Sequence, residues 1–233
     1  MDINIFHLSS GAREARGMAV VIDVFRAFSV ACYFFSRGAA RVIALQDVAQ
    51  ARALKAQHPQ WILAGERKGE KLAGFDCGNS PSEIVHANLS GKVVLHTTHA
   101  GTQSLCAVSE ADEILTGSFV NAGAVVDYIQ HKQPGVLSLV CAGIEDKTQS
   151  LEDLRCAEFI RDSVRGVEPR FEHILAELRA APSSAKFFDP LNTTFPETDF
   201  ELCLQLSKFP FVIRRTKTRE GMCELECVEK VRI

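Results

Sequence analysis

The chain has 233 residues, of which 46% are hydrophobic and 24% charged, and 26 Lys and Arg against 29 Asp and Glu give a formal net charge of -3. This composition predicts a globular protein with a sizeable core and excludes a disordered or low-complexity chain. The near-neutral charge argues against nucleic acid as the main partner, although a small anionic ligand needs only local positive charge.

The start of the chain does not read as a signal peptide, because Asp2 comes early and no basic flank precedes an apolar run. The longest apolar stretch, residues 18–35, contains Asp23 and Arg26 near its middle. Each of these charges would be costly in hydrocarbon. We therefore expect no segment that spans a membrane.

Short β-branched runs alternate with amphipathic helical patterns through the first two thirds of the chain. The predicted strands span residues 18–25, 41–45, 61–65, 92–97, 113–118 and 136–141. Near-continuous apolar strands separated by helices are typical of a parallel sheet covered on both faces. The sequence therefore predicts an α/β fold.

The last third of the chain has a different rhythm. Predicted helices at 168–180 and 198–206 precede predicted strands at 211–216 and 222–231, which we expect to pair as a hairpin. We interpret this part as an α+β tail that packs on the sheet. Since no fixed-period repeat and no linker composition is present, residues 1–233 are predicted to form one domain.

The pattern of the eight cysteines indicates the cellular compartment of the protein. They are scattered, mostly within apolar runs, where a thiol packs as a small hydrophobic group. Cys223 and Cys227 have no second Cys or His pair nearby, so they are not expected to form a zinc site. This usage is typical of a reducing compartment, and we expect a cytoplasmic protein.

Polar residues follow several predicted strands, at the edge where ligands bind in parallel sheets. Asp23 interrupts an apolar strand, and Arg26 follows three residues later. A buried carboxylate requires compensation. Asp23 could bind a divalent metal, pair with Arg26 or cap the following helix.

A glycine-rich segment after the third predicted strand is the densest cluster. Backbone amides at the helix start marked by Ser80 could receive an anion, with Arg67 or Lys68 adding charge. Glu66 and Asp76 offer the hard oxygen ligands that Mg²⁺ prefers. The alternative interpretation of this segment is a solvated surface loop.

Two further clusters also follow strands. Residues 96–103 carry hydroxyls and backbone amides suited to phosphate oxygens, and His96 and His99 are expected to make polar or ligand contacts more readily than to bind a metal. Glu152 and Asp153 begin a later helix. They could be helix-dipole partners or could complete an acidic metal site.

Five blocks, in this order, resemble the 2-phosphosulfolactate phosphatase family over about residues 18–160. They are VVIDVFRA, AGERKG followed by GFDCGNSP, TTHAGT, GSFVNA, and CAG followed by SLED. The resemblance implies a three-layer α/β/α fold, a possible homo-oligomer and a Mg²⁺-dependent phosphatase. The implied reaction removes phosphate from 2-phospho-3-sulfolactate, a step toward coenzyme M.

Carried over position by position, the resemblance assigns roles to individual residues. The implied catalytic residues are Asp23, Glu66 and Asp76. The implied Mg²⁺ ligands are Asp23, Asp76, Glu152 and Asp153. The residues implied to bind the anionic substrate are Arg26, Arg67, Asn79, Ser80, Thr97, Thr98, Thr102 and Asn121.

These roles predict metal-assisted displacement at phosphorus, in which an arginine clamps the anion and a carboxylate orients or deprotonates water. The chain departs from the family pattern at Phe28 and His99, both expected near the pocket. Two alternatives stay open. One is a related phosphoester as substrate, and the other is a non-catalytic protein that binds a small anion or metabolite with the same fold.

Overall fold

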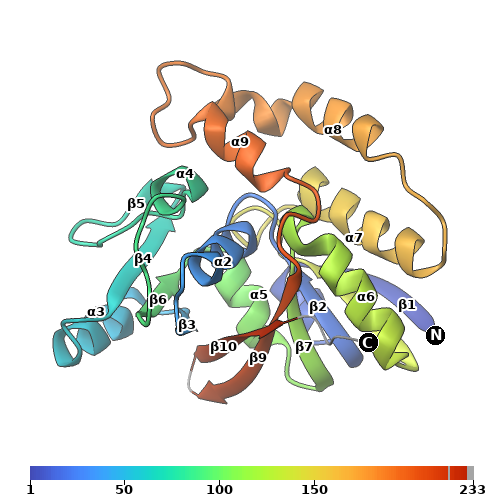
Figure 1. Ribbon diagram of the computed structural model, residues 1–233, viewed down its shortest axis with the longest axis horizontal. Helices are drawn as coiled ribbons and strands as arrows, with labels where there is room; N and C mark the ends of the chain where they lie inside the picture. The colour runs from blue at the N-terminus through green and yellow to red at the C-terminus, as the bar shows by residue number, and fades with distance from the viewer. Residues whose placement is uncertain (220, 230–233) are drawn as a thin grey trace.

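The computed structural model describes residues 1–219 and 221–229 and shows an α/β fold built on one ten-stranded sheet (Figure 1). The strands are β1 Asp2–His7, β2 Gly17–Ile22, β3 Arg41–Leu45, β4 Ile62–Arg67, β5 Glu70–Lys71, β6 Val93–Thr97, β7 Ala111–Gly117, β8 Val136–Cys141, β9 Phe211–Arg219 and β10 Met222–Glu229. The α-helices are α1 Leu8–Ala12, α2 Ala27–Ser36, α3 Val48–Gln57, α4 Pro81–Ile84, α5 Gly101–Ala107, α6 Ala122–Lys132, α7 Leu151–Val164, α8 Phe171–Ala180 and α9 Glu197–Cys203. Two 3₁₀ helices are η1 Phe119–Asn121 and η2 Pro182–Phe187.

Across the sheet the strands follow the order β1-β8-β2-β7-β9-β10-β3-β6-β4-β5. The first four form one parallel set, and β3, β6 and β4 form a second. The predicted α/β class, with a mainly parallel sheet flanked by helices, is therefore confirmed. Strand β1 escaped prediction, because it is a partly exposed edge strand without a continuous apolar run.

The C-terminal hairpin of β9 and β10 has a different place from the one predicted. It does not pack on the sheet but lies inside it, between β7 and β3. Val212, Ile213, Cys223 and Leu225 are buried there. Without the hairpin, each parallel set would present an edge strand with unpaired backbone groups. The hairpin therefore joins the two sets into one sheet.

The two parallel sets run in opposite directions, because the pairings of β7 with β9, β9 with β10 and β10 with β3 are all antiparallel. Six steps separate β2 from β4 in the sheet. At the usual twist per step, the strand direction turns by roughly 120–150° over that distance. The twist largely cancels the reversal and brings the carboxyl ends of β2 and β4 to one cavity.

Helix α2 lies between the two halves of the twisted sheet, next to α5 (Figure 1). Its sequence, AFSVACYFFS, is apolar on all sides, which is typical of a helix without a solvent face. Residues 27–35 are all buried. Helices α6 and α7 pack on the half that contains β2 and β8, and α3 packs on the half that contains β3 and β4.

The segment from α8 to α9 passes over the remaining elements, at the top of Figure 1. Aromatic rings attach it to the core, because Phe25 lies 4.9 Å from Phe187 and 5.5 Å from Phe200 between ring centroids. Helix α9 also packs against α4. Within the described part of the chain, no helix has both the length and the apolar character needed to cross a membrane.

Candidate active site

A cavity of about 190 Å³ lies where β2, β4, β6 and β8 end, and the segment between η2 and α9 contributes to its wall. Eight of the residues singled out from the sequence line it. They are Asp23, Arg26, Glu66, Lys68, Asn79, Thr98, His99 and Glu152. The structure thus gathers residues from five separate parts of the chain at one place.

Asp23 follows β2 and is buried. Its Oδ1 accepts a hydrogen bond of 3.0 Å from the amide of Ala27 at the start of α2. Gly101 lies so close that a Cβ there would be 2.6 Å from Oδ2, so this approach requires glycine. Burial above all, with the nearby charges of Glu66 and Glu152, raises the pKa of Asp23 to about 7. The group therefore exchanges a proton near neutral pH.

Glu66, near the end of β4, connects two loops at the cavity. Its Oε2 accepts a hydrogen bond of 2.6 Å from the amide of Gly69, and its Oε1 accepts one of 2.9 Å from the amide of His99. These bonds fix the turn after β4 against the loop after β6. Glu66 therefore shapes the cavity wall as well as adding negative charge.

The first turn of α7 carries two buried carboxylates. Oε2 of Glu152 is buried and has no hydrogen-bond partner among the described residues, and burial raises the pKa of Glu152. Asp153 accepts hydrogen bonds from the amides of Val24 and Gly143, at 2.8 and 2.9 Å. Asp153 does not line the cavity, and its bonds hold the ends of β2 and β8 to α7.

Arg26 lines the cavity but is already neutralised. Its Nη1 donates to Oδ2 of Asp199 at 2.6 Å, and both side chains are almost fully buried. Nη1 also donates to the carbonyl of Thr194, and Nη2 donates to that of Gly69. Ser80 donates to Oδ1 of the same Asp199, at 2.9 Å. Arg26 and Ser80, both predicted to bind substrate, thus anchor the segment around α9.

Four other predicted substrate-binding residues do not line the cavity. Arg67 donates to Oγ1 of Thr97 at 2.9 Å. Thr102, in α5, donates to the carbonyl of Thr98 in the loop before that helix. Asn121 accepts a bond from the amide of Ser118 and is buried at η1. These side chains support the loops whose other residues reach the cavity.

Asn79 lines the cavity and is held by His96, whose Nε2 lies 3.1 Å from Oδ1 of Asn79. Burial lowers the pKa of His96 to about 3, so the ring is neutral and donates through Nε2 to the amide oxygen. The His96 ring therefore bonds to Asn79 within the protein, whereas His99 lines the cavity. Phe28 belongs to α2, lies in the core and does not line the cavity, contrary to its expected position.

Lys68, named from the sequence as a source of positive charge, lines the cavity together with Gly69 of the same segment. Other lining residues were not assigned to the site from the sequence. Lys186 and Phe195 come from the segment between α8 and α9. That segment contains no recognisable sequence motif. Its aromatic residues, such as Phe187, were the one signal that could have indicated packing over the strand ends.

The acidic residues can be tested against the Mg²⁺ that the resemblance implies. Among the described residues, no group of three or more His, Cys, Asp or Glu side chains is placed to hold a metal ion alone. Mg²⁺ in such enzymes is commonly bound by one or two carboxylates with water and substrate phosphate. Asp23 and the unpaired Oε2 of Glu152 fit that mode, because a cation would relieve their mutual repulsion.

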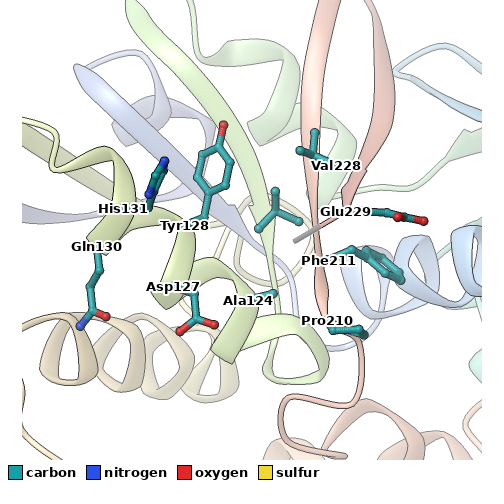
Figure 2. Close-up of a pocket in the computed structure, with 10 residues that line it drawn as sticks. Ala124, Asp127, Tyr128, Gln130, His131, Pro210, Phe211, Val228 and Glu229 are labelled. Atoms are coloured by element: carbon teal, nitrogen blue, oxygen red, sulfur yellow. The ribbon is translucent and has the colours of Figure 1, made fainter. Parts of the chain in front are cut away.

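A second cavity, of about 420 Å³, lies between α6 and the C-terminal hairpin (Figure 2). Figure 2 shows Ala124 and Tyr128 of α6 on one side and Phe211 and Val228 of the hairpin on the other. Although larger, it has no Lys or Arg among its described lining residues. A phosphoester requires positive charge or a metal. The smaller cavity is therefore the candidate active site.

Asp76, predicted both as a catalytic residue and as a metal ligand, is not brought to this cavity. Its Oδ2 accepts hydrogen bonds of 2.8 Å from Lys55 and from the amide of Leu63, and its side chain is 42% exposed. Partial burial acts to raise its pKa, but the bonds from Lys55 and Leu63 outweigh that effect and lower the pKa. The neighbouring turns separate Asp76 from Glu66 although both lie in one motif.

We expect Asp76→Asn to keep kcat/KM within about threefold of wild type in a phosphate-release assay, because the substitution is remote from the cavity. The melting temperature should fall slightly, because the ion pair with Lys55 is lost. A large loss of activity without loss of stability would return Asp76 to the active site.

Comparison with known proteins points to one family. Residues 5–218 match the sequence profile of the family described as 2-phosphosulpholactate phosphatase. A probable 2-phosphosulfolactate phosphatase of Thermotoga petrophila is 36% identical over 79% of this chain and 83% of that protein. A protein of the same name from Caldicellulosiruptor saccharolyticus is 41% identical over 62% of this chain and 61% of that protein. Another, from Bacillus subtilis, is 28% identical over 92% of this chain and 93% of that protein. With its α/β architecture and nearly its whole length matched, the chain belongs to the 2-phosphosulfolactate phosphatase family.

Proposed function

We propose that the protein is a Mg²⁺-dependent phosphatase that hydrolyses the phosphate ester of 2-phospho-3-sulfolactate or a related small phosphorylated acid. The observation that carries the proposal is the pair of buried carboxylates, Asp23 and Glu152, in a cavity of about 190 Å³ that also holds Lys68 and Lys186. Carboxylates that can hold a cation, beside basic side chains, suit metal-assisted attack on a phosphate ester. The small cavity also suits a small substrate. Family membership and the names of the relatives support the same reaction.

The cavity residues divide into groups with different tasks. Lys68 and Lys186 supply positive charge for the anionic substrate, and Asn79 and Thr98 supply polar contacts. Asp23 accepts a proton from the attacking water as its oxygen bonds to phosphorus and the bond to the ester oxygen breaks, and the same proton is then available to the departing alkoxide. Asp23 and Glu152 would hold Mg²⁺, which when bound neutralises phosphate oxygens and so favours attack.

The test is release of inorganic phosphate from 2-phospho-3-sulfolactate and from a panel of phosphorylated hydroxyacids, with added Mg²⁺ and with EDTA. We expect release that requires Mg²⁺ and returns when the metal is restored. Phosphate release that EDTA does not affect would reject the Mg²⁺ requirement but leave the proposed phosphatase activity standing. If no compound released phosphate while 3-sulfolactate raised the melting temperature, the protein would be a small-anion-binding member of the family.

A further inference from the structure

The proposed reaction gives Lys186 only the general task of supplying positive charge, and does not say which group of the substrate it meets. It lies in η2, outside the sequence blocks that carry the resemblance, and it is half-buried at the cavity wall. Its Nζ lies 4.5 Å from the ring centroid of Phe195 and 5.5 Å from that of Phe187. Within the described residues it makes no ion pair and no hydrogen bond. The ammonium group is thus partly desolvated and lies against two aromatic rings.

The other basic side chains around the cavity differ from Lys186. Arg26 is neutralised by Asp199 at 2.6 Å, and Lys68 is exposed. The negative charge of Glu152 acts on Lys186, yet the two groups are too far apart to form an ion pair. Burial lowers the pKa of Lys186, while Glu152, Asp23 and Glu66 raise it. The cavity therefore holds separate acidic and basic positions, and neither Oε2 of Glu152 nor the ammonium group of Lys186 has a hydrogen-bond or ion-pair partner among the described residues.

A ligand with two anionic groups fits this separation. If the phosphate lies with the carboxylates and their cation, a second acid group on the same small molecule has Lys186 as its counterion. A hydrogen bond between an ammonium group and an acid group is stronger than one between neutral groups. Because Phe195 and Phe187 restrict the side chain, little conformational freedom is lost on binding.

We propose that Lys186 binds the second anionic group of the substrate, a sulfonate or carboxylate, and so determines the preference for phosphorylated acids over simple phosphate monoesters. This inference rests on the proposed function and deepens it by naming the substrate class. Lys186 is thereby a specificity-determining residue. A residue of η2, in the C-terminal third, then selects the substrate, while residues at the strand ends carry out the hydrolysis.

The test uses Lys186→Met, which keeps the length of the side chain and its packing on the rings but removes the charge. Lys186→Arg is the conservative variant. Lys208→Met is the matched control, because Lys208 also lies over aromatic rings, Tyr33 and Phe209, but does not line the cavity. Four substrates are compared. They are 2-phospho-3-sulfolactate, 2-phospholactate, 2-phosphoethanesulfonate and ethyl phosphate.

For Lys186→Met we expect kcat/KM to fall about 10–100-fold on substrates with the recognised acid group, mainly through KM, and to change little on ethyl phosphate. A loss on 2-phosphoethanesulfonate but not on 2-phospholactate identifies the sulfonate, and the reverse identifies the carboxylate. Lys186→Arg should recover most of the activity, and Lys208→Met should match wild type. An equal loss on all four substrates, or no loss, would overturn the proposal.

Failure of the proposed function can be told apart from failure of this inference. If the wild type hydrolyses none of the four substrates, the phosphatase proposal fails, and titration with 3-sulfolactate then tests Lys186 alone. Weaker binding by Lys186→Met at unchanged melting temperature would support the inference. Equal binding by both proteins, or none by the wild type, would reject it.

Discussion

Asp23→Asn is expected to lower kcat by about 10³-fold, the largest loss of activity from any single substitution in the cavity. Asn keeps the shape of the side chain and an oxygen that can accept from the Ala27 amide, but it cannot accept a proton. It also removes one of the two carboxylates proposed to hold Mg²⁺. The measurement is steady-state phosphate release, with Asp76→Asn as the matched control. A variant with kcat within tenfold of wild type would exclude Asp23 as the base.

The same substitution has an expected effect on stability that activity assays do not report. Folded Asp23 holds its proton up to a pKa of about 7, whereas the ordinary value is 3.8. Between these pH values the folded state binds more protons than the unfolded state, so the free energy of unfolding falls as the pH rises through this window. Above about pH 7 the contribution is constant.

Urea denaturation of the metal-free proteins at several pH values between 4 and 8 measures this contribution. Asp23→Asn should lack the decline, so the difference in unfolding free energy between variant and wild type should shift in favour of the variant as the pH rises. His96 acts in the opposite direction, because its lowered pKa makes stability fall at acid pH. Its effect is common to both proteins and cancels in the comparison. A difference that does not change with pH would show that Asp23 titrates normally.

Asp199→Ala is expected to destabilise the protein by about 3–5 kcal/mol, because it leaves the Arg26 guanidinium buried without its counterion. Ser80 and Ser82 lose the acceptor of their hydrogen bonds as well. For a chain of this length such a loss lowers the melting temperature by about 6–20 °C. Calorimetry or urea denaturation would measure it.

A double substitution separates the buried charge from the packing. Arg26→Met combined with Asp199→Leu removes both charges and should be more stable than Asp199→Ala alone, since neither charge is then left unpaired. A destabilisation by Asp199→Ala below about 1 kcal/mol would mean that water reaches Arg26. Such a result would also weaken the view that this ion pair holds the α9 segment over the cavity.

Part of the site could be predicted from local patterns. Asp23 stands out because a carboxylate interrupts an apolar strand, and the structure places it in the cavity with Glu66, Asn79 and Thr98. Asp23 and Thr98 directly follow β2 and β6, Glu66 lies near the end of β4, and Asn79 precedes α4. The resemblance did not separate residues that reach the cavity from residues that support it. Thr97 and Asn121 are in the same blocks but bond to the protein itself.

The sequence by itself determined the α/β class and most strands, because strand and helix periodicity depend on residues close together in the chain. Only the tertiary structure decided that the β9–β10 hairpin lies inside the sheet, that Asp76 turns toward Lys55 and that Lys186 completes the cavity wall. The physical reason is the same in the three cases. Each outcome depends on contacts between segments that are distant in the chain and on the accumulated twist of the sheet. Lys186, for example, lines one cavity with Asp23, which is more than a hundred residues away in the sequence. No local sequence pattern contains that information.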